Sequence, residues 1–188
     1  MRKIIGLLAV FQLFFICLLA QTGTLPPVDK SPMDMSYYPA NYPALKIQDK
    51  ITEAPTARII YSRPQKAGRT IFGGLVKYGE VWRLGANEAT EIEFFKNVRI
   101  GGKKISKGRY TLYAIVNENY WTIIINKDTD TWGSFKYDAK KDVVRATASV
   151  QKTDTVVESL SMGFEKATGG FNLVIGWDTI KSTLLITF

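Results

Sequence analysis

A strict alternation of apolar and polar residues constrains this fold more than any other feature of the sequence. The clearest run is 143–150, where valine and alanine occupy every second position. Similar runs occur at 90–95, 109–116, 120–126, 156–164, 171–177 and 182–188. Because successive side chains of a strand point to opposite faces, this period of two predicts antiparallel strands that are each buried on one face.

Short turn motifs separate these runs. Gly101-Gly102, Asn117–Asn119 and Thr168–Gly170 each join two alternating runs, as expected for hairpins. No run shows helical periodicity. We therefore predict one all-β domain over residues 46–188, a single antiparallel β-sandwich or jelly-roll-like fold of about nine to eleven strands. A closed β-barrel is the alternative. The shared parity predicts a core that includes Leu112, Ala114, Trp121, Ile123, Ile125, Ala146, Leu173 and Ile175.

Residues 21–45 differ from the domain because they are rich in proline and tyrosine. Pro26, Pro27, Pro32, Pro39 and Pro43 all lie in this stretch. Proline lacks a backbone N–H and fixes its own φ, so this density argues against a helix or a central strand. We expect an extended arm that packs partly on the domain.

The first twenty residues have the order of a secretory signal peptide. Arg2 and Lys3 precede an apolar run from Ile4 to Leu19, and the small residue Ala20 follows. An uncleaved membrane anchor is the alternative, but the run is short for a hydrocarbon core of ~30 Å. We therefore expect residues 1–20 to be removed and the mature protein to be exported to the periplasm, cell envelope or extracellular space, without a membrane span.

The residue types missing from the mature chain exclude several kinds of chemistry. The whole sequence has no histidine, and its one cysteine, Cys17, lies within the predicted signal peptide. His- or Cys-dependent catalysis is thereby excluded, and we expect no metal and no cofactor. Loss of Arg2 and Lys3 reduces the net charge from +8 to +6. The remaining positive residues are spread out, so no nucleic-acid partner is expected, and the oligomeric state stays open.

The segment 61–90 is where a binding site is expected. Its alternation is weak, and five glycines allow sharp turns among long polar side chains. The candidate ligand-binding residues are Arg63, Arg69, Trp82, Arg83, Asn87 and Glu88. Arginine offers a planar fork for a carboxylate, and tryptophan offers a stacking face. The alternative is a purely structural connection whose arginines pair with local acids such as Glu80 and Glu88.

Several motifs resemble one known family. They read YSRP, GRTIFGGLV, GEVWRLGANEAT, IGGKKISKGRYTLYAI and WTIIINK, and SPMDMSYYPANYP precedes them. Together they resemble the secreted bacterial domain-of-unknown-function 2911 family. The resemblance implies an exported, β-rich protein and no established activity. Some similar sequences are labelled asparagine synthetase B, but that activity needs a cysteine nucleophile and a pyrophosphate-binding loop, and the mature sequence has neither.

Three functions are compatible with these observations. The favoured one is a non-catalytic binding module for a small polar, carbohydrate or acidic ligand. A structural envelope protein without a small ligand is the second. The third is a carboxylate-dependent glycan hydrolase or lyase, which needs two acids facing each other across one cleft.

Overall fold

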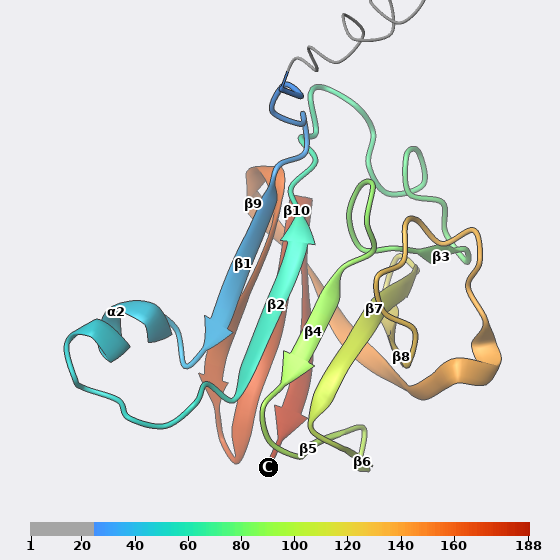
Figure 1. Ribbon diagram of the computed structural model, residues 1–188. Helices are drawn as coiled ribbons and strands as arrows, with labels where there is room; N and C mark the ends of the chain where they lie inside the picture. The colour runs from blue at the N-terminus through green and yellow to red at the C-terminus, as the bar shows by residue number, and fades with distance from the viewer. Residues whose placement is uncertain (1–24) are drawn as a thin grey trace, which may run out of the picture.

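The computed structural model describes residues 25–188, so the predicted signal peptide lies outside the described part of the chain. The chain from there on is built almost entirely of strands (Figure 1). These elements are β1 (Met33–Tyr38), α2 (Tyr42–Ile47), β2 (Ala57–Ser62), β3 (Val81–Trp82), β4 (Glu91–Phe94), β5 (Val98–Ile100), β6 (Lys103–Ile105), β7 (Gly108–Val116), β8 (Tyr120–Asn126), the short helix η2 (Ala139–Lys141), β9 (Asp142–Ala167) and β10 (Gly170–Thr187).

Every strand pair in the sheet is antiparallel, which confirms the predicted fold class. The strands follow the order β1-β2-β4-β7-β8-β9-β10-β5-β6, and β3 pairs with β7 at the side. Within residues 25–188 the two ends of this order, β1 and β6, do not pair with each other, so the alternative of a closed barrel is wrong. The three predicted turns all join paired strands.

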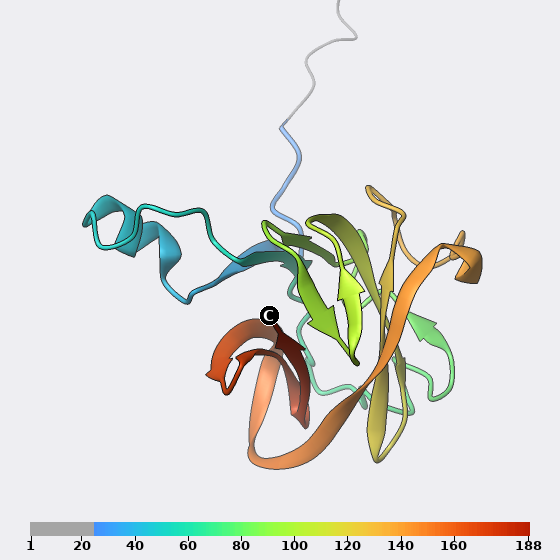
Figure 2. The ribbon, with the colours of Figure 1, turned by 90° about the horizontal axis from the view of Figure 1, so that it is seen from below.

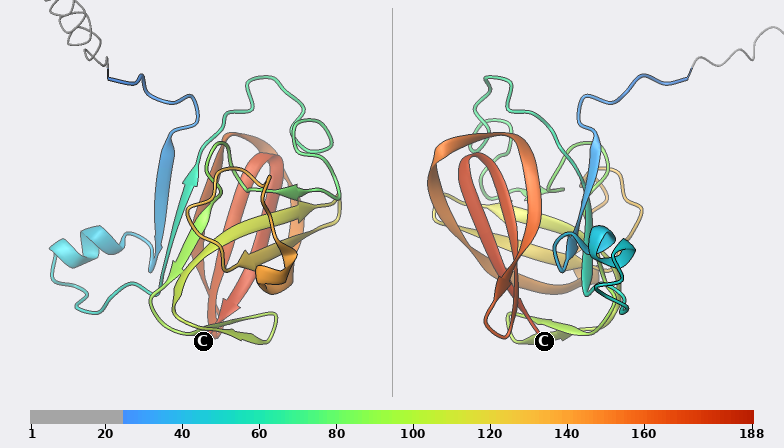
Figure 3. Two further views of the ribbon diagram at one scale, coloured as in Figure 1. Left: turned by 45° about the vertical axis from the view of Figure 1, so that its right-hand side comes forward. Right: turned by 90° about the vertical axis from the view of Figure 1, so that its left-hand side faces the viewer.

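The long strand β9 turns this sheet into two layers. Its first part pairs with β8 and the rest pairs with β10, with a register shift opposite Asp178. Beyond that shift β9 curves back over β2, where the Leu160 amide donates to the Pro64 carbonyl at 3.0 Å. Figure 2 shows β9 and β10 curving away from the other strands, and the right panel of Figure 3 shows them opposite β1 and β2.

The space between the layers is filled by the predicted core. All eight residues expected there are buried, and Leu112, Ile123 and Leu173 are fully inaccessible to solvent. At one end of this core four aromatic side chains cluster: Phe72, Trp82, Trp121 and Trp177. The rings of Trp82 and Trp177 stack with centroids 5.9 Å apart, so strands β3 and β10 are joined through the core.

The proline-rich arm is more ordered than the sequence suggested. Residues 33–38 form β1, an edge strand, which is a position that tolerates nearby proline. Residues 42–47 form α2, and the prediction of an arm without helix is wrong there. Pro43 lies in the first turn, where its missing N–H has no intrahelical partner to lose.

Candidate functional site

A small pocket opens beside the irregular segment between β2 and β4. Its volume is about 190 Å³. It is lined by Ser31, Pro64, Arg69, Leu75, Val76, Trp82, Arg83, Gly85, Ala86 and Trp177. Eight of the ten, Pro64 and the seven from Arg69 to Ala86, come from one stretch of chain. The N-terminal arm and β10 supply the others. We call this the arginine pocket.

The segment that forms the arginine pocket is held in place by buried anchors and backbone hydrogen bonds. Ile71 and Leu84 are fully buried although they lie outside the main strands. The Val76 amide donates to the Ile71 carbonyl at 2.8 Å, which closes a tight loop. The Lys66 amide donates to the Glu158 carbonyl at 2.7 Å, which ties this loop to β9. The pocket wall is therefore supported by both layers.

Arg83 is the most unusual residue of the arginine pocket. It follows β3, and its side chain is partly buried beside Trp82. Its Nε atom is buried without a hydrogen-bond partner, and the side chain makes no ion pair with any described residue. Burial lowers the pKa of Arg83 below its ordinary value. A guanidinium stays charged in proteins, so this positive charge is desolvated and uncompensated.

Arg69 brings a second positive charge to the same pocket. Its guanidinium donates to the backbone carbonyls of Lys66, at 3.0 Å, and Gln65. Neutral carbonyls orient this side chain but do not cancel its charge. The nearby Lys66 ammonium pairs with Asp178 at 2.9 Å. Because the pocket lining contains no aspartate or glutamate, Arg69 and Arg83 make it electropositive.

The six predicted site residues divide into two groups. Arg69, Trp82 and Arg83 converge in the arginine pocket. Arg63 lies elsewhere, because its guanidinium donates to Asp34 at 3.0 Å and to the Ser161 hydroxyl at 2.8 Å, joining β1 to β9. Asn87 and Glu88 do not line the arginine pocket, and Glu88 lines a different cavity.

The alternative of a purely structural connection is wrong about the partner of Arg83. It assumed an ion pair with Glu80 or Glu88, and the described residues show neither pair. Sequence reasoning also missed two pocket residues, Ser31 and Trp177. They lie far from segment 61–90 in the chain, and no local pattern points to them.

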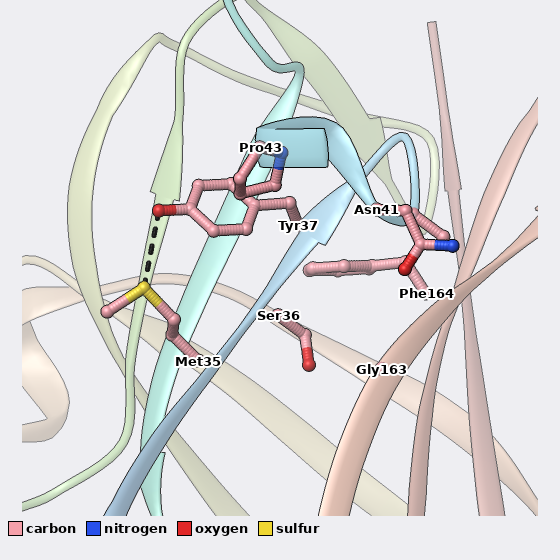
Figure 4. Close-up of a pocket in the computed structure, with 8 residues that line it drawn as sticks. Met35, Ser36, Tyr37, Asn41, Pro43, Gly163 and Phe164 are labelled. Carbon is pink, nitrogen blue, oxygen red and sulfur yellow. Dashed lines mark hydrogen bonds between the residues drawn. The ribbon is translucent and has the colours of Figure 1, made fainter. Parts of the chain in front are cut away.

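A larger cavity between β1, α2 and β9 is a weaker candidate. Its volume is about 470 Å³, and Figure 4 shows its lining. Tyr37 and Pro43 lie on one side and Phe164 on the other, with the Ser36 side chain between them. The Tyr37 hydroxyl is already directed to the Met35 sulfur at 3.2 Å. The lining holds no charged residue, so it offers little to orient a polar ligand.

A polar cluster around Tyr137 satisfies its own hydrogen bonds. The Tyr137 hydroxyl donates to Asp142 at 2.6 Å and accepts from Arg145 at 2.7 Å. Desolvation, followed by the hydrogen bond to Asp142, raises the pKa of Tyr137 from 10.0 to about 12. This network holds the turn before β9, and we assign it a structural role.

Residues 25–188 contain neither a metal-ligand cluster nor a membrane-spanning helix. No group of three or more Asp, Glu, Cys or His side chains is arranged to hold a metal ion. No helix in this part of the chain has the length and apolar character needed to cross a membrane.

Comparison with known proteins identifies the family. The family model described as "Protein of unknown function (DUF2911)" matches residues 43–186. The chain belongs to this family. The match covers nine of the ten lining residues of the arginine pocket, all but Ser31. Searches of curated proteins and of solved structures gave no match.

Proposed function

We propose that this DUF2911 protein is an exported, non-catalytic binding module whose ligand is a small organic anion held in the arginine pocket. The observation that carries the proposal is the unpaired, partly buried guanidinium of Arg83. A desolvated charge without a partner destabilises the folded protein. An anion in the pocket would offset that cost with charge-assisted hydrogen bonds.

The size and lining of the pocket narrow the ligand class. About 190 Å³ is smaller than the roughly 300–1,000 Å³ typical of sites for drug-sized molecules. A compact carboxylate or sugar acid fits this volume better than a nucleotide. Leu75, Val76 and the edge of Trp82 provide an apolar wall against which the carbon skeleton of the ligand packs.

The pocket favours binding over hydrolysis. Glycoside hydrolysis uses two carboxylates that flank the scissile bond. The arginine pocket is lined by two arginines and no acid. A hydrolase acting there would lack both its general acid and its nucleophile or base.

A thermal-shift screen followed by calorimetry tests the proposal. The probes are pyruvate, succinate, citrate, glucuronate and phosphate at constant ionic strength. At least one should raise the Tm of the wild type, since a ligand that binds only the folded state stabilises it. Arg83→Met should weaken that binding by about tenfold or more, the effect of losing a charge-assisted hydrogen bond.

Arg99→Met is the matched control. Arg99 is exposed on β5, and within residues 25–188 its guanidinium donates only to the Gly102 carbonyl, so this variant removes the same charge far from the pocket. Its affinity should equal that of the wild type. Equal weakening in both variants would mean that only net charge matters, and no stabilisation by any probe would favour a structural protein without a small ligand.

Export is tested separately. The motive is the order of charge, apolar run and small residue in 1–20. Intact mass measurement of protein from an envelope fraction should give a chain that begins near Gln21. Recovery of the full chain with Met1 from the cytosol would overturn this part of the proposal.

A further inference from the structure

A second hollow is lined in part by Glu88 and Ala89, which belong to the same loop as Arg83. Its volume is about 390 Å³, and it shares no lining residue with the arginine pocket. Trp132 is the one aromatic residue among its lining residues, and 63% of the Trp132 surface is accessible. The charged lining comes from Glu88, Glu91 and Asp130, and Met33 and Ile60 contribute apolar lining. We call this the Trp132 groove.

Trp132 is exposed but firmly held. It forms a β-bridge with Glu88, and the next amide, that of Gly133, donates to the Asn87 carbonyl at 2.8 Å. On the other flank the Ala89 amide donates to the Thr131 carbonyl at 3.0 Å. The backbone on both sides of the indole is thus fixed to the loop that follows β3.

Phe135 supports the indole from outside the groove. The two rings stack with centroids 5.8 Å apart and an interplanar angle of 19°. Phe135 does not line the groove. Gly133 makes this stacking possible: its φ is +70°, and a Cβ there would lie 2.7 Å from the Phe135 ring. The indole is therefore pre-organised, which reduces the entropy lost on binding.

We propose that the Trp132 groove binds a sugar ring of a neutral glycan. The apolar face of a pyranose packs on an aromatic ring, while its hydroxyl groups need acceptors around the edge. Glu88 supplies a free acceptor, because its carboxylate forms no ion pair or hydrogen bond with the described residues. Asp130 lies at the rim with its side chain 68% exposed and also pairs with Arg109, which adds donors.

The lining disfavours two other occupants. An apolar peptide would cover the Glu88 carboxylate without giving it a partner, which is costly. A small anion would be repelled by three carboxylates, of which Arg109 compensates two. A neutral polyol escapes both penalties.

Calorimetry and protein-detected NMR with maltohexaose, cellohexaose, xylohexaose and chitohexaose test the proposal. At least one should bind the wild-type mature protein and perturb the Trp132 indole resonance. Trp132→Ala should weaken that binding by about tenfold or more, as expected for the central aromatic residue of a site. Phe135→Ala should weaken it by a smaller factor, because it removes the support and not the platform.

Two variants control the experiment. Tyr120→Ala removes an aromatic ring that is 47% exposed on β8, away from the groove, and should leave affinity unchanged. Arg83→Met should also leave it unchanged, so this proposal can fail or succeed independently of the anion site. Absence of binding to all four glycans would overturn the proposal. So would a dimer, measured by light scattering, that Trp132→Ala dissociates, because that result would assign the groove to protein contact.

Discussion

The β9–β10 hairpin and the segment between β2 and β4 represent two ways in which this chain positions side chains. In the hairpin, alternate residues such as Leu173 and Ile175 face the core through regular pairing. In the segment, Ala67, Leu84 and Asn87 have left-handed backbone conformations, and side-chain direction changes from one residue to the next. Regular pairing builds the core, whereas the irregular backbone can bring two arginines to one pocket.

The same contrast exists within the segment itself. Arg63 adjoins β2, and its guanidinium is matched by Asp34 and Ser161. Arg83 lies next to β3 and has no such partner. Two residues of the same type, twenty positions apart, thus have opposite energetic roles. One joins strands, and the other maintains an unpaired charge at the cost of stability.

The largest expected effect is a loss of stability when a core residue of the regularly paired strands is shortened. Ile123 is fully buried at the centre of β8, and Ile123→Ala should lower the free energy of unfolding by about 2–5 kcal/mol through lost burial and a cavity. Urea denaturation measures this. Leu185→Ala, at a half-exposed position on β10, is the control and should cost less than about 0.5 kcal/mol. Equal losses would mean that the alternation does not identify the core.

In the irregular segment between β2 and β4, stability should fall more when an added side chain crowds the backbone than when apolar surface is removed. A Cβ at Gly74 would overlap the backbone oxygen of Thr70, so Gly74→Ala should cost about 1–3 kcal/mol. Gly68→Ala is the comparison, since a Cβ there meets nothing within 4 Å and only the positive φ opposes it. That variant should cost about 1 kcal/mol. A larger loss at Gly68 than at Gly74 would contradict this packing.

The two arginines provide a matched pair of smaller effects on stability. Arg63→Met should destabilise the protein by about 1 kcal/mol, because Asp34 loses its ion-pair partner and the Ser161 hydroxyl loses its donor. Arg83→Met should leave stability unchanged or raise it by up to about 1 kcal/mol, since it removes an unpaired charge. Both are measured by chemical denaturation without ligand. A clear loss in Arg83→Met would show that Arg83 is structural.

The smallest effect is the pH dependence of stability that Tyr137 contributes. Folding raises its pKa from 10.0 to about 12, so the folded protein keeps a proton that the unfolded chain releases in this interval. The stabilisation is complete below pH 10 and is lost as the pH rises toward 12. Solvent screening limits it to less than about 1 kcal/mol. Tyr137→Phe should therefore lose less stability than the wild type between pH 10 and about pH 12. Identical slopes would contradict the assignment.

The sequence predicts the regular parts of this molecule well. Alternation identified the faces of β7, β8 and β10, and glycine or asparagine identified the hairpin turns. It could not identify α2, because a helix of six residues with Pro43 in its first turn has too little periodicity to detect.

The candidate site was predictable only in part. Arg69, Trp82 and Arg83 belong to one glycine-rich stretch, so their residue types and proximity in the chain were informative. Ser31 and Trp177 come to the arginine pocket from distant parts of the chain, and that depends on how β9 bends the sheet. Whether Arg63 or Arg83 is paired also depends on tertiary contacts, since Asp34 and Ser161 lie on strands remote in sequence.

The position of β5 has a kinetic consequence. Ile100 and Arg99 pair with Ile186 and Thr187, so β5 and β6 join the sheet only when the last residues of β10 are available. Contacts of such long sequence separation form late, because the loop between them must first be closed. The chain can form its β7–β8 hairpin early, but β5 and β6 stay outside the sheet until almost all of the polypeptide is available. For the proposed export, this order would mean that the fold is completed only after the chain has crossed the membrane.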